Sequence, residues 1–334
     1  MTKSIRERTE DIEQQILSER AVLVSNSKGR ERQEEPDDIR TAFQRDRDRI
    51  VHAKAFRRLK HKTQVFISPE GDHYRVRLTH TLEVSQIART AARALRLNED
   101  LAEAIALGHD LGHTPFGHLG EEALSPLLEK PFRHNEQSLR VVDYLENEGR
   151  GLNLSWEVRD GIVNHTWSMP VPATLEAQVA RFSDRIAYVN HDVDDAIRAG
   201  IISPDDLPAE AIATLGPTHG DRINALVSDL VSESEDADQI GLSPPRMDAL
   251  TRLRDFLFER VYLRLEAKGE QEKAIALVRS LFSYYLGHPD AIPVEYRSSP
   301  GDLPTHVADY IAGMTDRFAL RTYEQLFLPQ GWLL

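Results

Sequence analysis

Cysteine is absent from the 334-residue chain. Disulfide bonds, thiolate nucleophiles and zinc sites with sulfur ligands are therefore excluded, and the absence fits a reducing compartment. No stretch approaches the roughly 18 consecutive apolar residues that a membrane span needs. The first residues, MTKSIRERTEDIEQQ, are charged and contain no apolar run. We therefore expect no signal peptide, no membrane partner and a cytoplasmic location.

Positive charge is scarce overall but concentrated in one segment. The formal net charge of -13 argues against a protein that coats nucleic acid. Residues 45–62, RDRDRIVHAKAFRRLKHK, are nevertheless rich in lysine and arginine and contain only Asp46 and Asp48 as acids. A basic segment in an acidic protein indicates a local anion site. A solvated helix face with ion pairs four residues apart explains the same pattern.

Apolar residues recur at steps of three and four along most of the chain, which predicts an all-α fold. The clearest helix spans 174–199, where Thr174 can cap it and Gly200 can end it. Residues 63–78 alternate around Pro69-Glu70-Gly71-Asp72, which predicts a small β-hairpin. The other expected helices span 3–22, 40–60, 79–96, about 101–110, 134–148, 156–165, 246–267, 269–286 and 304–327, with loops at 24–38 and 232–246.

Neither an internal repeat nor a linker rich in Pro, Gly or Ser divides the chain. We expect an N-terminal helix and flexible loop over 1–39 and a helical core over 40–230. A C-terminal helical extension over 231–334 is expected to pack on that core.

Three histidines and an aspartate fall within residues 109–118, HDLGHTPFGH, directly after the apolar helical segment LAEAIAL. At a helix end beside a loop of glycine and proline, side chains can point into a cleft. Imidazole nitrogen and carboxylate oxygen suit hard and borderline divalent ions, and no thiol is present. A His-Asp pair alone occurs often by chance, but two more histidines in the same loop strengthen the interpretation as a metal site.

Further ligands must come from other helices. His80 lies on the apolar stripe of its helix, where a core histidine bonded to a backbone carbonyl is the simpler explanation. Asp184, Tyr188 and Asp192 share one face of the 174–199 helix, with Arg185 beside them. A solvated, charged face is the alternative, and the apolar residues interspersed in this stretch weaken it.

The order His … His-Asp … Asp resembles the HD superfamily of metal-dependent phosphohydrolases. His80, His109, Asp110 and Asp184 occupy the places of its metal ligands. The match is closer to the deoxynucleoside triphosphate triphosphohydrolases (dGTPase-like, type 2), and it implies an HD-domain helical bundle with its phosphohydrolase core in 40–230. The similar segments are FQRDRDRIVHAKAFRRLKHKTQVF (43–66), RLTHTLEVSQIAR (77–89), ALGHDLGHTPFGHLGE (106–121), HNEQSLRVV (134–142), DRIAYVNHDVDDAI (184–197) and VADYIAGMTDRFAL (307–320).

The resemblance also implies residues that bind substrate. Arg77 resembles a phosphate-binding arginine, and Gln64 resembles a residue that contacts the deoxyribose. Arg185, Tyr188 and Asp192 resemble a group that contacts phosphate and sugar, in which Asp192 accepts from the 3′-hydroxyl. A tyrosine packed under C2′ would exclude a ribose hydroxyl.

Three histidines resemble those around the α-phosphate in this family: His113, His118 and His134. Asn135 stands where some relatives carry a glutamate, although Glu136 is adjacent. The implied reaction is attack by water at the α-phosphorus, which releases deoxynucleoside and tripolyphosphate. His118 or His134 would protonate the 5′-oxygen, since histidine titrates near neutrality.

The implied cofactor is one divalent ion per active site: manganese, magnesium, iron, nickel or zinc. Such an ion would polarise the α-phosphate and lower the pKa of bound water. The lysines and arginines of 54–62, together with Arg77 and Arg185, would hold the triphosphate. The resemblance further implies a homo-oligomer, tetrameric or hexameric, and permits a deoxynucleotide activator or nucleic acid as a partner.

Two other functions are consistent with the same residues. An HD-type nucleotide 5′-phosphatase or phosphodiesterase would share the ligands but release orthophosphate or a monophosphate. The segments at 54–66 and 184–192 favour the triphosphohydrolase. A nucleotide-sensing or nucleic-acid-binding protein with weak catalysis is the third reading. The basic segment permits it, whereas the intact set of four ligands argues against a dead enzyme.

Overall fold

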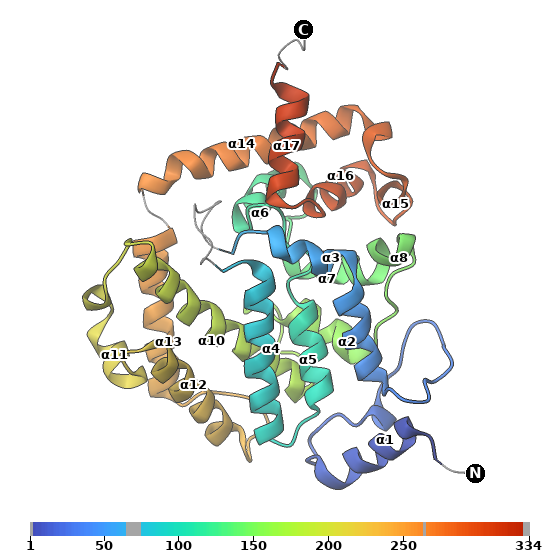
Figure 1. Ribbon diagram of the computed structural model, residues 1–334, viewed down its shortest axis with the longest axis vertical. Helices are drawn as coiled ribbons and strands as arrows, with labels where there is room; N and C mark the ends of the chain where they lie inside the picture. Colours follow the sequence, from blue (N-terminus) through green and yellow to red (C-terminus); the bar gives the residue numbers. More distant parts are fainter. Residues whose placement is uncertain (1–2, 65–74, 263–264, 330–334) are drawn as a thin grey trace. The chain divides into compact units, whose positions relative to one another are not determined.

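The computed structural model describes residues 3–64, 75–262 and 265–329 (Figure 1). Within these ranges the chain forms helices joined by turns, and its only β-pairing is two isolated antiparallel bridges, Arg30 with Ser155 and Thr63 with Val76. The all-α prediction is confirmed. The turn of the predicted hairpin, residues 65–74, lies outside the described residues, and the Thr63–Val76 bridge lies at the two ends of that segment.

The chain divides into two compact units, and each is assembled from segments far apart in the sequence. The first unit comprises Met1–Val51, Thr79–His109 and Asn153–Arg264; the second comprises His52–Leu78, Asp110–Leu152 and Leu265–Leu334. The division into 1–39, 40–230 and 231–334 stays a prediction. No described helix is long and apolar enough to cross a membrane.

The long helix α10 (Leu175–Arg198) organises the first unit, and its side chains are buried along most of its length. It packs against α5, α9, α12 and α13. The Thr174 hydroxyl accepts from the Ala177 N–H at 3.2 Å, and Gly200 adopts φ +67° just beyond the helix. Both predicted boundaries are therefore confirmed. The helices of this unit are α1 (Ile5–Ile16), α2 (Ala42–His52), α4 (Arg77–Ala94, from Thr79 on), α5 (Glu99–Gly108), α9 (Trp156–Asn164), α10, α11 (Ala209–Leu215), α12 (His219–Ser234) and α13 (Pro244–Leu257).

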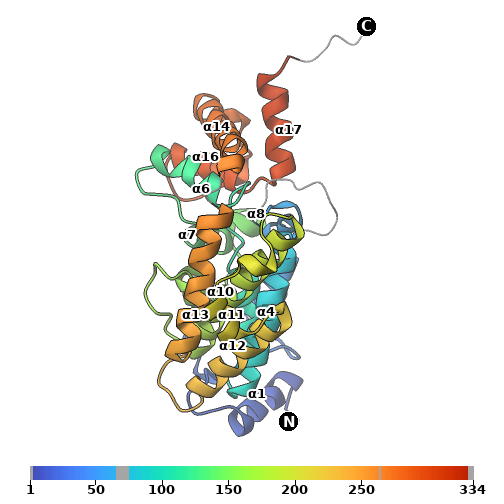
Figure 2. The ribbon, with the colours of Figure 1, turned by 90° about the vertical axis from the view of Figure 1, so that its left-hand side faces the viewer.

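The second unit is built around α14 (Leu265–Gly287), which packs against α6 (His118–Leu124), α16 (Leu303–Ala312) and α17 (Asp316–Phe327) (Figure 2). Its apolar core includes Phe116, Leu124, Val278, Phe282, Val307 and Ile311. The remaining helices are α3 (Lys54–Arg58), α7 (His134–Arg140), which continues into a π-turn (Val141–Leu145), α8 (Glu146–Gly149) and α15 (Val294–Arg297).

Several predicted helices are interrupted or end early. The helix expected over 3–22 is α1, which ends at Ile16, and in the helix expected over 134–148 Asn147 and Glu148 have positive φ. The helix expected over 40–60 breaks at Ala53, which is extended, and α3 then begins at Lys54. The Glu146 carboxylate accepts the backbone N–H groups of Lys54 and Ala55 at 3.0 and 2.7 Å, so it satisfies donors that a helix start leaves open. The helix expected over 304–327 likewise stops at Ala312, and Thr315 caps α17. Helices α6, α11, α12 and α15 are not predicted from the sequence.

Candidate active site

Three buried histidines and one aspartate converge in the first unit. His80 lies on α4, His109 caps the C-terminal end of α5, His165 caps that of α9, and Asp184 lies on α10. Each of the three rings is only 2% exposed. Asp184 Oδ1 lies 3.2 Å from His80 Nε2 and 3.7 Å from His109 Nε2. The His80 and His109 ring centroids are 5.6 Å apart.

A backbone hydrogen bond orients the His109 ring. Its Nδ1 lies 2.6 Å from the Ala106 carbonyl oxygen. A carbonyl oxygen can only accept, so Nδ1 carries a proton, and in the neutral ring Nε2 carries the lone pair. Anchoring of the distal ring nitrogen in this way is common among histidines that bind metals. The lone pair of Nε2 therefore lies close to an oxygen of a carboxylate, which is the arrangement a cation stabilises.

The donor set fits a divalent ion. Donor atoms that bind the same ion at about 2.1 Å lie between about 3.0 and 4.2 Å apart, and both distances to Asp184 fall in that range. Burial works against ionisation of Asp184, but the hydrogen bond with His80 and the positive charge that His109 and His80 carry when protonated outweigh it. The pKa of Asp184 therefore lies below its usual range, and the side chain is a carboxylate at neutral pH.

A second cluster of polar side chains lies in the second unit and includes Asp110. The two oxygens of Asp110 are held by Arg77 Nη1 at 2.9 Å and by His113 Nε2 at 3.1 Å. The His113 ring stacks on the His134 ring, with centroids 3.9 Å apart and planes 12° apart. Arg77 is the first residue of α4, Asp110 and His113 lie in the loop after α5, and His134 is the first residue of α7. A carboxylate, a guanidinium and two imidazoles thus lie in direct contact.

Glu121, on α6, links the histidines of the second unit. His118 Nδ1 and His134 Nδ1 each lie 3.0 Å from the same oxygen, Glu121 Oε1. The His134 side chain is 14% exposed and that of His118 is 78% exposed. Glu136, the acid next to Asn135 in the sequence, is half exposed, and its Oε1 lies 4.0 Å from Arg133 Nη1. The acid that pairs with His134 is therefore Glu121.

The three imidazoles differ in their electrostatic surroundings. Burial, followed by the charge of Arg77, holds the pKa of His113 well below its usual range. Burial also opposes protonation of His134, but the Glu121 carboxylate outweighs it and raises the pKa of His134. Burial alone would raise the pKa of Glu121, but the charge of His134 and the hydrogen bond from His118 have a larger effect. The pKa of Glu121 therefore lies well below its usual range. The second unit thus presents a neutral imidazole beside a readily protonated one.

Arg185, Tyr188 and Asp192 follow Asp184 along α10. The Arg185 guanidinium lies 4.5 Å from the centroid of the Trp167 ring and donates to Thr251 Oγ1 at 3.3 Å. Burial and the charge of Asp184 raise the pKa of Tyr188 to about 12. The Tyr262 hydroxyl donates to Asp192 Oδ2. This group therefore lies on the same helix as the metal-type aspartate, with Asp192 already oriented by a tyrosine.

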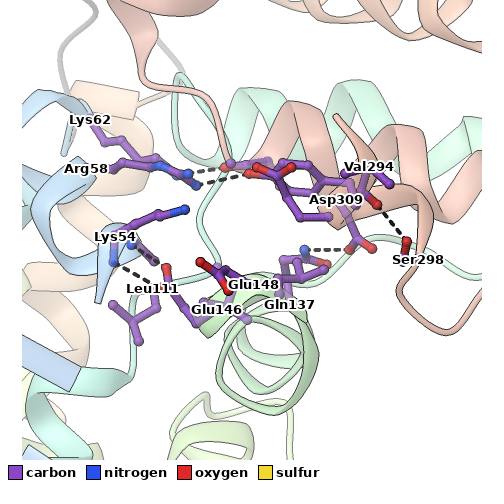
Figure 3. A pocket seen from close by; sticks show the side chains of 18 residues that line it. Lys54, Arg58, Lys62, Leu111, Gln137, Glu146, Glu148, Val294, Ser298 and Asp309 are labelled. Carbon is purple, nitrogen blue, oxygen red and sulfur yellow. Dashed lines mark hydrogen bonds between the residues drawn. The ribbon is translucent and has the colours of Figure 1, made fainter. Parts of the chain in front are cut away.

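A separate cavity of about 400 Å³ lies within the second unit. Figure 3 shows Lys54, Arg58 and Lys62 on one side of it and Asp309 on the other. Lys62 is buried, and its ammonium donates to the carbonyl oxygens of His113 and Ala312. Burial and the charge of Arg58 lower the pKa of Lys62 to about 7. Lys62 thereby ties the loop that carries His113 to α16.

The structure thus groups the predicted site residues by unit. In the first unit it brings together His80, His109 and Asp184, and it places Arg185, Tyr188 and Asp192 further along α10. The second unit contains Gln64, whose side-chain oxygen is buried, and the contacting set of Arg77, Asp110, His113, His118 and His134. Sequence reasoning missed His165 and Glu121. Glu121 could have been found from the sequence, because a residue three positions after His118 lies on the same face of a helix.

Comparisons with known proteins identify the family of the chain. Residues 77–189 match the HD domain family and residues 240–325 match the phosphohydrolase-associated domain. A deoxyguanosinetriphosphate triphosphohydrolase-like protein of Caldanaerobacter subterraneus subsp. tengcongensis is 58% identical over 330 residues, covering 98% of this chain and 97% of the relative. One from Desulfatibacillum aliphaticivorans is 51% identical over 346 residues, covering 98% and 99%.

A solved structure supports the fold. The crystal structure of a phosphohydrolase from Bacteroides thetaiotaomicron superimposes with a TM-score of 0.52 at 16% identity, covering 83% of this chain and 68% of that chain. Likeness at that identity concerns the fold alone, whereas the relatives match along almost the whole chain. The protein is therefore a hydrolase and belongs to the deoxyguanosinetriphosphate triphosphohydrolase-like family of HD-domain proteins.

Proposed function

We propose that this protein is a metal-dependent triphosphohydrolase that converts a deoxynucleoside triphosphate and water into deoxynucleoside and tripolyphosphate. The observation that carries the proposal is the convergence of His80, His109 and Asp184, with the Asp184 oxygen 3.2 and 3.7 Å from the two imidazole nitrogens. The names of the relatives, which refer to triphosphohydrolysis of dGTP, support the same reaction class.

We assign the metal ligands to His80, His109, Asp110 and Asp184. Asp110 follows His109 directly in the chain, and its contact with Arg77 orients its carboxylate. Nitrogen and oxygen donors without thiolate are compatible with manganese, magnesium, iron, nickel or zinc. When bound, such an ion supplies a Lewis acid for the α-phosphate and acidifies a coordinated water.

The histidines of the second unit would handle the protons of the reaction. The 5′-oxygen leaves as an alkoxide and needs a proton, and the His118–His134 pair can provide it because Glu121 orients both rings. The Glu121 carboxylate also favours the protonated form of His134. His113, whose pKa is low, would stay neutral and orient water or a phosphate oxygen.

Substrate recognition is assigned to α10 and the start of α4. Tyr188 and Asp192 follow Asp184 at steps of four, so a sugar held by them would lie next to the phosphate at the metal. The bond from Tyr262 would hold Asp192 ready to accept the 3′-hydroxyl. Arg77 and Arg185 would bind phosphate oxygens, and Gln64 would contact the deoxyribose. The proposal also includes assembly into a homo-oligomer and activation by a second deoxynucleotide.

The test is a metal screen against all four deoxynucleoside triphosphates, alone and in mixtures, with product identification by anion-exchange chromatography. Tripolyphosphate and deoxynucleoside in equal amounts are expected. Asp184→Ala should abolish their release, because a metal ligand is lost while the helix former alanine keeps α10 intact. Release of orthophosphate or a nucleoside monophosphate would contradict the proposal. Activity seen only in mixtures would establish activation by a second nucleotide.

A further inference from the structure

His165 is a buried histidine that the proposed metal site does not include. It caps the C-terminal end of α9, and its ring centroid lies 5.0 Å from that of His109, with the two planes at 78°. One donor atom of each of His109, His165 and Asp184 lies within 4.8 Å of the other two. The side chain is therefore close enough to take part in binding the same cation.

The hydrogen bonding of His165 repeats that of His109. Its Nδ1 lies 2.8 Å from the carbonyl oxygen of Ile162, three residues earlier, just as His109 Nδ1 lies 2.6 Å from that of Ala106. By the same reasoning Nδ1 carries a proton, and in the neutral ring Nε2 carries the lone pair. Two helices of the first unit thus end in the same way, each with an imidazole fixed to its own last turn.

Helix packing directs both imidazoles toward the same carboxylate. Helices α5 and α9 pack against each other, and both pack against α10, which carries Asp184. An apolar side chain would fill the same volume without burying a polar nitrogen, so an imidazole whose nitrogen lies beside the Asp184 carboxylate has a role beyond packing.

We propose that His165 is a further ligand of the divalent ion bound by His80, His109 and Asp184, through its Nε2. The assignment rests on the proposed metal-dependent function and deepens it. It gives the site a third imidazole donor, which favours borderline ions such as iron, nickel or zinc over magnesium.

The test measures metal binding directly, in the absence of nucleotide. Chelator-treated full-length protein is titrated with Mn²⁺ by isothermal titration calorimetry, and with Co²⁺ while its visible d–d absorption is recorded. His165→Ala should weaken Mn²⁺ binding by about tenfold or more. It should also change the Co²⁺ spectrum, since one nitrogen donor leaves the coordination sphere. Circular dichroism of the metal-free proteins verifies that the variant is folded.

Two further variants separate coordination from packing. His165→Phe keeps an aromatic ring beside His109 but has no nitrogen, so it should lose affinity as His165→Ala does. His288→Ala is the matched control, because His288 also lies 2.9 Å from a backbone carbonyl through its Nδ1 but is exposed at the end of α14 in the other unit. It should bind Mn²⁺ like the unaltered protein. If His165→Ala does not fold, His165→Gln takes its place in both measurements.

Affinity and Co²⁺ spectrum unchanged in His165→Phe would overturn the inference and leave His165 a packing residue. That outcome would not touch the proposed function if the unaltered protein still releases tripolyphosphate. Conversely, a protein that releases another product, yet loses metal affinity with His165→Ala, would contradict the proposed function and support the inference.

Discussion

At the scale of single residues, the sharing of Glu121 Oε1 by His118 and His134 has a consequence for the pH dependence of catalysis. Glu121→Gln removes the negative charge that raises the pKa of His134, so that imidazole loses its proton at a lower pH. The alkaline limb of the kcat profile should therefore move to lower pH. Loss of an oriented proton donor should also reduce kcat by about a hundredfold.

The measurement is kcat between pH 5.5 and 9.5 at saturating metal and substrate. Glu122→Gln is the matched control, because Glu122 is the next residue on α6 and is exposed. Profiles of Glu121→Gln and the unaltered protein that superimpose would rule out a role for Glu121 in setting the proton donor.

A second residue-scale prediction concerns sugar selection. Tyr188→Ala should open space beneath the sugar, so the ratio of kcat/KM for ribonucleotides to that for deoxyribonucleotides should rise by about tenfold or more. Steady-state kinetics with dGTP and GTP give this ratio. Tyr144→Ala, which alters an exposed tyrosine of the second unit, should leave it unchanged. An unaltered ratio in Tyr188→Ala would remove Tyr188 from sugar recognition.

The sequence predicts site residues that belong to a recognisable motif. It does not predict residues that reach the site only through tertiary contacts. His80, His109 and Asp184 were predicted from their order in the chain, and the structure brings these three together. His165 carries no motif, and only the packing of α9 on α5 and α10 places it beside His109. The acid that meets His134 could not be read from its neighbours Asn135 and Glu136, because α6 supplies it.

At the scale of elements, the loop after α5 depends on close approach to α7. A Cβ added to Gly112 would lie 2.1 Å from the Ser138 nitrogen and 2.5 Å from the His134 carbonyl oxygen. Both are backbone atoms and cannot rotate away. Gly112→Ala should therefore force the loop that carries Asp110 and His113 away from the helix that carries His134.

We expect Gly112→Ala to destabilise the protein by about 1–3 kcal/mol, as overpacking does, and to reduce kcat strongly because the His113–His134 stack is disturbed. Urea unfolding followed by circular dichroism, together with steady-state kinetics, measures both effects. Gly287→Ala is the control within the same unit, since a Cβ there meets no atom within 4 Å. Normal activity in Gly112→Ala would show that this close approach is not required.

Local signals account for the helices that were predicted and for those that were not. The α10 boundaries follow from a capping threonine, a terminal glycine and an uninterrupted apolar stripe. The break at Ala53 has no local cause, since its stabilising partner Glu146 is distant in sequence. Helix α6 begins directly after Phe116 and Gly117, both with positive φ, in a segment whose glycine and proline content indicated a loop.

At the scale of the whole molecule, each unit is assembled from three separated segments. Hydrophobic periodicity and turn residues report only on neighbours in sequence, so they give no sign that 52–78, 110–152 and 265–334 assemble together. An ion bound by His80, His109 and Asp184 would join α4, α5 and α10 within the first unit. Metal binding should therefore stabilise the fold as well as serve catalysis.

This expectation can be tested by thermal unfolding. An ion that binds only the folded protein stabilises it by RT ln(1 + [M]/Kd), about 2.7 kcal/mol at a hundredfold excess over Kd. Mn²⁺ added to chelator-treated protein should therefore raise the unfolding midpoint by a few degrees, in a saturable manner. Asp184→Ala should abolish the rise, whereas Asp194→Ala, a partly exposed aspartate on the same helix, should retain it. An equal rise in both variants would place the stabilising ion elsewhere on this acidic protein and separate it from the histidine cluster.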